Sequence, residues 1–105
     1  MAHITDRERR VGLHLPLDVA GQDVTGTSFR DSTRTVNISG GGLCFETHRE
    51  LTLGARLALQ IALPPPLQKH FGGKAIYKAR GVICRAERAP DQDVARVGVR
   101  FLGEL

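Results

Sequence analysis

The residues with the clearest potential for chemistry lie in one stretch, Thr35 to Phe45, which reads TVNISGGGLCF. Within it, Asn37 and Ser39 precede three consecutive glycines, Gly40 to Gly42. Asparagine and serine can hydrogen-bond the backbone at a turn, and glycine permits positive φ and close approach of a ligand to the chain. Successive exposed amides in such a turn can hold an anion. The stretch also fits an ordinary hairpin connection built from common turn residues.

A second feature is the basic N-terminal segment, where Arg7, Arg9 and Arg10 fall within four residues. An arginine fork donates two hydrogen bonds to phosphate oxygens, so an unstructured arm carrying these side chains could close over a phosphate-bearing ligand. The alternative is a solvated tail. The net charge of +4 is compatible with an anionic partner and also with simple solubility.

Side chains suited to enzyme or metal chemistry are scattered. No HExxH spacing relates the four histidines, which are His3, His14, His48 and His70. Cys44 and Cys84 lie forty positions apart without a CxxC or Cys/His pattern, so we expect free thiols. Ser39 lacks the GxSxG elbow of a nucleophilic serine. We therefore expect no catalytic residues, no metal site and no cofactor.

Six extended segments must position these residues. The strongest alternation runs from Leu57 to Leu63, where every second residue is apolar, and a similar pattern covers Ala95 to Phe101. Gly81 suits a bulge or bend inside a long strand, and Pro64–Pro66 must end a strand because proline donates no ladder hydrogen bond. The remaining segments are Leu13–Val19, Thr33–Ser39, Leu43–Thr47 and Lys74–Glu87.

Glycine or proline separates nearly all of these segments, which favours an antiparallel barrel or sandwich over a βαβ architecture. A chain of 105 residues fits one core. The apolar runs are too short to span a bilayer, and no apolar segment with a cleavage site follows the charged N-terminus. We therefore expect no membrane span, no secretory signal and a cytoplasmic location.

The pattern as a whole resembles the PilZ family, whose signatures are a basic RxxxR stretch before the first strand and a [D/N]xSxxG motif in a later turn. Asn37, Ser39 and Gly42 match the second motif in full. In the first, Arg10 and His14 give RxxxH, and Arg9 occupies the adjacent basic position. Further similarities are Leu15-Pro16-Leu17 after the basic stretch and Val97-Gly98-Val99-Arg100-Phe101 near the end.

The resemblance implies an all-β fold, a six-stranded antiparallel Greek-key β-barrel with little or no C-terminal helix. Residues 1–14 would be a flexible basic arm and residues 15–105 the barrel. The implied ligand is cyclic-di-GMP. Arg9 and Arg10 would bind its phosphates or guanines from the arm, and Asn37 and Ser39 would contact it from the barrel. Gly42 would leave room for the turn to approach the ligand.

Three functions follow as hypotheses. The first is a cyclic-di-GMP receptor that orders its arm around the ligand and so signals to a protein partner. The second is a related adaptor that has lost nucleotide binding and acts through protein contacts; it is favoured by His14, which lacks the permanent charge and fork of arginine. The third is nucleic-acid binding, which fits poorly because only 5% of residues are aromatic and none is tryptophan.

Overall fold

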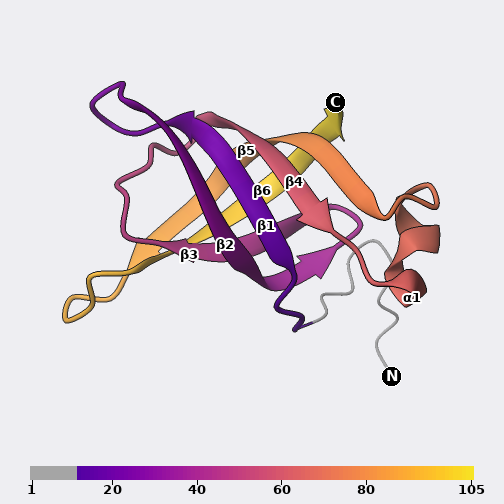
Figure 1. The fold of residues 1–105 in the computed structure, drawn as a ribbon. Coiled ribbons are helices and arrows are strands. Elements are labelled where there is room, and N and C mark those ends of the chain that lie inside the picture. Colours follow the sequence, from indigo (N-terminus) through magenta and orange to yellow (C-terminus); the bar gives the residue numbers. More distant parts are fainter. Residues whose placement is uncertain (1–11) are drawn as a thin grey trace.

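The structure, a computed structural model, describes residues 12–105 (Figure 1). Antiparallel strands form a closed barrel in the order β1-β2-β3-β6-β5-β4. The strands of this barrel are β1 Pro16–Gln22, β2 Ser28–Ser39, β3 Gly42–Thr47, β4 Arg56–Ala62, β5 Ile76–Arg88 and β6 Ala95–Glu104. Successive strands β4, β5 and β6 are neighbours and β3 lies beside β6, which is a Greek-key arrangement. The predicted six-stranded all-β barrel is confirmed.

Alternation of apolar residues builds the interior of the barrel. In β4, Leu57, Leu59 and Ile61 are buried, whereas Arg56, Ala58 and Gln60, which precede them in turn, are exposed. Fully burying such a side chain contributes about 1.5–3 kcal/mol relative to leaving it in water. Because a slip of one residue would turn the apolar set outward, burial also fixes the register of each strand.

β2 is longer than its sequence pattern indicates. It begins at Ser28, five residues before the predicted start at Thr33. Only Phe29 is buried in the added part, so apolar periodicity is weak there. The added residues are ordered by pairing with β1, which runs from Gln22↔Ser28 to Pro16↔Arg34.

β5 carries the irregularity predicted at Gly81. The register with β6 shifts between Arg80 and Gly81, and a Cβ on Gly81 would overlap the side chain of Val99. A second shift, between Ile83 and Arg85, has no glycine or proline to mark it in the sequence.

The prolines end β4 as predicted, since the strand stops at Ala62. The chain then forms a short helix, α1 (Pro65–Gln68), and a 3-10 turn, η1 (Lys69–Phe71). Phe71 is buried, and its ring centroid lies 4.9 Å from that of Tyr77 and 6.4 Å from that of Phe101. These aromatic rings extend the core at this end of the barrel.

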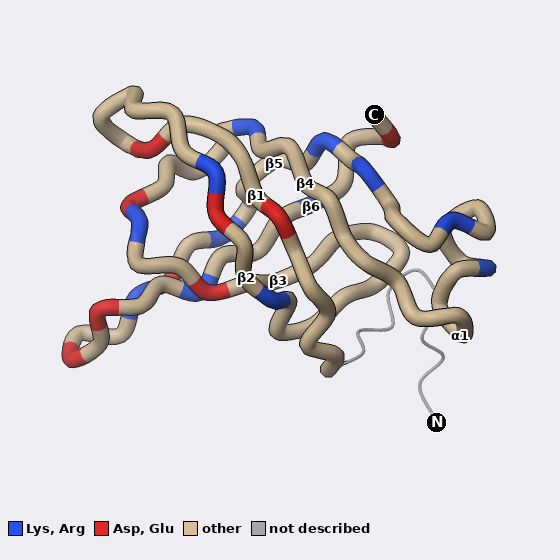
Figure 2. Tube along the Cα trace, viewed as in Figure 1, with Lys and Arg blue, Asp and Glu red and all other residues tan. Residues whose placement is uncertain are grey.

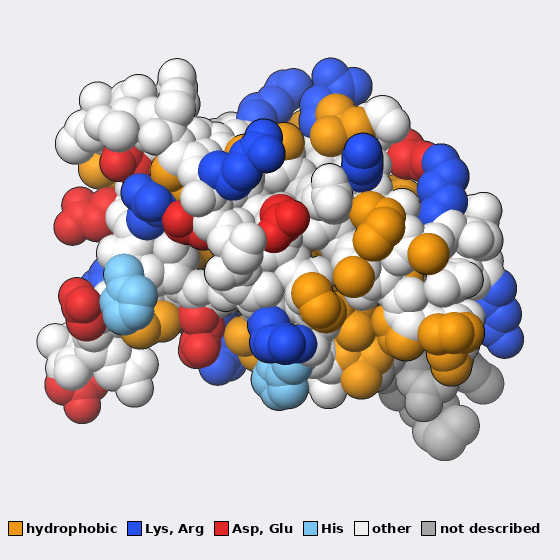
Figure 3. Space-filling model, in the orientation of Figure 1, with side chains coloured by type: hydrophobic (Ala, Val, Ile, Leu, Met, Phe, Trp, Pro, Cys, Tyr) orange, Lys and Arg blue, Asp and Glu red, His pale blue; other side chains and the backbone are white. Residues whose placement is uncertain are grey.

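The two ends of the barrel differ in character (Figure 2). The β1–β2 turn, the β3–β4 loop and the β5–β6 turn share the end that we call the acidic end; they contain Asp23, Glu50, Asp91 and Asp93. The β2–β3 turn, α1 and the start of β1 share the opposite end, which we call the motif end. Figure 3 shows hydrophobic side chains gathered over α1. No helix within residues 12–105 is long and apolar enough to cross a membrane.

Candidate ligand-binding site

The turn between β2 and β3 brings Ser39 and Gly42 together as the last paired residues of the two strands. The Ser39 hydroxyl accepts a hydrogen bond from the Gly41 N–H at 3.3 Å and donates to the Gly42 carbonyl at 3.4 Å. The Ser39 hydroxyl therefore stabilises the turn through these two hydrogen bonds. A ligand could still reach its remaining lone pair, since the residue is only half-buried.

Glycine is required at position 42 because there is no room for a side chain. A Cβ at this position would overlap the backbone carbonyl of Val99 on β6. Its φ lies outside the left-handed region, so the reason for glycine here is close approach of two strands. The Gly41 carbonyl nearby accepts a hydrogen bond from the Phe101 N–H at 2.9 Å, which ties the turn to β6.

A β-bulge turns Asn37 and Ser39 to the outer face of the barrel. β2 pairs with β3 at Thr35↔Phe45 and next at Asn37↔Cys44, so one extra residue, Val36, is inserted. Before the bulge Phe29 and Thr35 point inward, and after it Ile38 does. Without the bulge, regular alternation from Thr35 would point Asn37 and Ser39 into the core. Bulges commonly re-aim side chains in this way.

The residues just before β1 run alongside this bulge. The Thr35 N–H donates to the Leu15 carbonyl at 2.9 Å, and the Leu15 N–H donates to the Thr35 hydroxyl at 2.9 Å. His14 Nδ1 lies 3.0 Å from the Thr35 carbonyl, to which it donates, and Arg34 donates to the His14 carbonyl at 3.1 Å. The chain thus enters β1 beside the Asn37 motif, with the exposed His14 at the junction.

Four of the six residues predicted for the site therefore meet at the motif end: His14, Asn37, Ser39 and Gly42. Arg9 and Arg10 lie outside the described residues, as does nearly all of the predicted arm, so the boundary predicted between residues 14 and 15 stays a prediction. Thr35 and Val36 lie inside the stretch singled out from the sequence, but the anchoring role of Thr35 and the bulge at Val36 were not predicted, because neither residue is one of the motif positions.

Comparison with solved structures identifies the fold. The Bacillus subtilis inhibitor of motility MotI/DgrA matches 91% of this chain with a TM-score of 0.66 and 19% identity. K. pneumonia MrkH matches 84% with a TM-score of 0.58 and 7% identity. This chain spans 42% of the first protein and 32% of the second. The PilZ domain of YcgR from Escherichia coli, solved with c-di-GMP, matches 90% of this chain, with 76% of its own chain covered, a TM-score of 0.53 and 18% identity.

No curated protein sequence matches the chain. The sequence does match the PilZ domain family over residues 5–104. The chain belongs to the PilZ domain family. The match includes all six predicted site residues, so both halves of the proposed site fall inside the family's span.

Two other polar regions of this PilZ domain lie away from the motif. One is a hollow of about 470 Å³ between β2 and the end of β3. There Arg49 makes two hydrogen bonds to Asp31, at 2.6 and 2.9 Å, and its guanidinium lies 4.5 Å from the centre of the Phe29 ring. The hydrogen bonds from Arg49 hold the pKa of Asp31 below its ordinary value. None of the predicted site residues lines this hollow.

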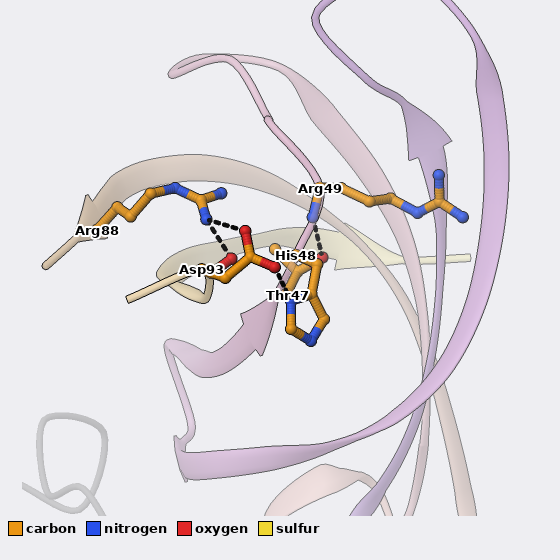
Figure 4. Close-up of polar contacts among 5 residues, drawn as sticks. All are labelled: Thr47, His48, Arg49, Arg88 and Asp93. Carbon is orange, nitrogen blue, oxygen red and sulfur yellow. Dashed lines mark hydrogen bonds and ion pairs between the residues drawn. The ribbon is translucent and has the colours of Figure 1, made fainter. Parts of the chain in front are cut away.

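The other region is a charged cluster at the acidic end (Figure 4). Asp93 lies 3.2 Å from His48 Nδ1 and 3.9 Å from Arg88, and the Asp93 carbonyl accepts a further hydrogen bond from Arg88. The Asp93 and His48 side chains are 89% and 72% exposed. These solvent-exposed contacts fasten the β5–β6 turn to the end of β3. Within residues 12–105 no three His, Cys, Asp or Glu side chains are grouped so as to hold a metal ion.

Proposed function

We propose that this PilZ domain is a cyclic-di-GMP receptor whose site lies at the motif end, between the N-terminal arm and the outer face of β2. The observation that carries the proposal is the bulge at Val36, which turns Asn37 and Ser39 outward beside the point where the arm joins the barrel. The solved PilZ domain of YcgR contains c-di-GMP, which supports this ligand.

The residue types suit the chemistry of the ligand. Cyclic-di-GMP presents two phosphates and two guanine edges, and an arginine fork can donate to phosphate oxygens or to guanine O6 and N7. Arg10 is four residues before His14, so the covalent chain keeps it within about 14 Å of that residue. Arg9 and Arg10 would therefore bind from the arm, while the amide of Asn37 binds from the barrel.

A receptor must also change when the ligand binds. A ligand shifts an equilibrium only by its differential affinity for the two states, and contacts from both arm and barrel exist only when the arm lies over the sheet. Ligand binding would therefore hold the arm against β2 and change the surface offered to a protein partner. No chemical step is needed, so the module acts as a binding protein and has no enzyme activity.

The proposal is tested by calorimetric titration of the full chain with cyclic-di-GMP from micromolar to millimolar concentrations. Arg10→Ala and Asn37→Ala should each weaken binding by about 10- to 100-fold, because each removes hydrogen bonds to the ligand, charge-assisted in the case of Arg10. Arg30→Ala, on the exposed face of β2 seven residues before Asn37, removes a charge away from the motif and serves as the matched control. Wild-type affinity retained by both site variants would contradict the site.

A second candidate is an adaptor that does not bind the nucleotide. The observation that favours it is His14, which stands in the second arginine position and already donates to the Thr35 carbonyl through Nδ1. A folded wild-type protein that gives no heat of binding at millimolar ligand would support the adaptor. Binding gained by His14→Arg would then show that the rest of the pocket is intact.

A further inference from the structure

The outer face next to the motif is formed by four neighbouring strands whose residues lie in rows. One row runs from Asn37 through Cys44 and Gly98 to Arg85. The adjacent row runs from Ser39 through Gly42 and Arg100 to Val82. Each step to the next strand is about 4.8 Å, so Arg85 starts roughly 14 Å across the sheet from Asn37.

The Arg85 side chain extends back across β6 toward the motif. Its guanidinium lies 3.6 Å from the sulfur of Cys44 on β3. The side chain passes over Gly98, which lies between them: a Cβ built there would be in ordinary van der Waals contact with the Arg85 side chain, 3.4 Å from its Cβ and 3.6 Å from its Nε. The shift in register between Ile83 and Arg85 sets Arg85 opposite Gly98.

Arg85 stays charged and accessible in this position. Its contact with the Cys44 sulfur, followed by the nearby carboxylate of Glu87, raises its pKa above the ordinary value. Its Nε lies 3.0 Å from a Glu87 carboxylate oxygen, and its side chain is 52% exposed. N–H groups of this guanidinium therefore remain open to an anionic ligand.

The charges on and around β6 also favour the binding of an anion on this face. Arg100, in the Ser39 row, is exposed, and no carboxylate within residues 12–105 pairs with it. The carboxylates of this face lie one row beyond Arg85, where Arg96 is 3.3 Å from Glu46 and is paired in register with Glu87. The sheet is therefore basic in the two rows that contain the motif residues.

We propose that Arg85, assisted by Arg100, is a nucleotide-binding residue of this site and supplies from the sheet the second arginine that the arm lacks at His14. The proposal rests on the proposed function. On binding, the Arg85 guanidinium exchanges its contacts with Glu87 and Cys44 for a phosphate or a guanine edge of cyclic-di-GMP. Glu87 competes with the ligand for the same guanidinium.

The test is a cyclic-di-GMP titration of the full chain carrying Arg85→Gln, with Arg80→Gln as the control. Arg80 is on the same strand and exposed, and its partners Ala58 and Gly103 place it one row outside the two motif rows. Arg85→Gln should weaken binding at least tenfold and Arg80→Gln should leave it unchanged. Glu87→Gln should strengthen binding by up to about fivefold, because it removes the competing carboxylate.

A rescue experiment tests whether Arg85 takes the role of the arginine that is missing at position 14 or contributes only its positive charge. Adding His14→Arg to Arg85→Gln should restore most of the lost affinity, since either arginine then meets the ligand. Wild-type affinity in Arg85→Gln, or equal losses in the Arg85 and Arg80 variants, would overturn the role of Arg85 while the proposed function stands. Absence of wild-type binding at millimolar ligand would overturn the proposed function and the role of Arg85 with it.

Discussion

Thr35 and Leu15 hold each other through two hydrogen bonds, from the Thr35 N–H to the Leu15 carbonyl and from the Leu15 N–H to the Thr35 hydroxyl, each 2.9 Å long. The same hydroxyl donates to the Leu13 carbonyl. Thr35 is fully buried. One side chain therefore fixes the residues just before β1 at the point where the bulge begins, two positions before Asn37.

Replacing Thr35 with valine should loosen this junction. Valine has a similar shape but leaves the Leu15 N–H and the Leu13 carbonyl without their partner, which costs about 1–3 kcal/mol of unfolding free energy. Urea denaturation measures that loss, and hydrogen exchange should show faster exchange at the Leu15 amide. Thr33→Val, in the regular part of the β1–β2 ladder, is the control. A Leu15 amide that exchanges as slowly as in the wild type would refute the anchoring role.

Gly42→Ala should destabilise the barrel, because its new Cβ would overlap the Val99 carbonyl, which is backbone and cannot rotate away. The expected loss is about 1–3 kcal/mol, as for other overpacked sites. Gly103→Ala on β6 is a matched control, since a Cβ there meets no atom within 4 Å. Thermal unfolding compares the two variants, and equal melting temperatures would disprove the steric explanation.

Much of the fold is predictable from local sequence because burial imposes its period on the chain. Leu57 to Ile61 alternate clearly, and the prolines after Ala62 mark the end of that strand. The first part of β2 is different: Ser28 to Ser32 contains one buried residue, Phe29, and takes its extended form from pairing with β1. Such non-local pairing leaves no periodic signal in the segment itself.

The site is less predictable than the fold. Asn37 and Ser39 can be recognised by type and spacing, but the face on which they lie depends on the bulge at Val36. No glycine marks that bulge, and simple alternation from Thr35 would point both side chains inward. The position of Arg85 cannot be predicted from the sequence for a related reason. It lies in a motif row because of the register between β5, β6 and β3 and because of a register shift that no glycine or proline marks.

Low pH should reduce the stability of the folded barrel, because it protonates the carboxyl group of Asp31. Hydrogen bonds from Arg49 lower the pKa of this carboxyl in the folded state, so its stabilising effect is complete above the ordinary carboxyl pKa of about 3.9 and is lost as the pH falls through the lower folded value. The melting temperature of Asp31→Asn should therefore be lower than that of the wild type at pH 7, and the difference between the two should become smaller below about pH 4. Asp91→Asn, in the exposed β5–β6 turn, is the control. A difference in melting temperature that does not change with pH would contradict this effect of Asp31.

Nucleotide affinity should depend on the side chain at position 14. His14 Nδ1 donates to the Thr35 carbonyl at 3.0 Å, so the ring has at most one further nitrogen to offer to a phosphate. Arginine at this position would add a permanent positive charge and a fork of N–H donors.

Calorimetry should therefore show that His14→Arg binds cyclic-di-GMP up to about tenfold more tightly than the wild type. His48→Arg, at the acidic end beside Asp93, adds the same charge away from the motif and should leave the affinity unchanged. Equal affinity in the wild type and in His14→Arg would show that position 14 does not contact the ligand, and the second arginine position would then contribute nothing that Arg85 and the arm do not already supply.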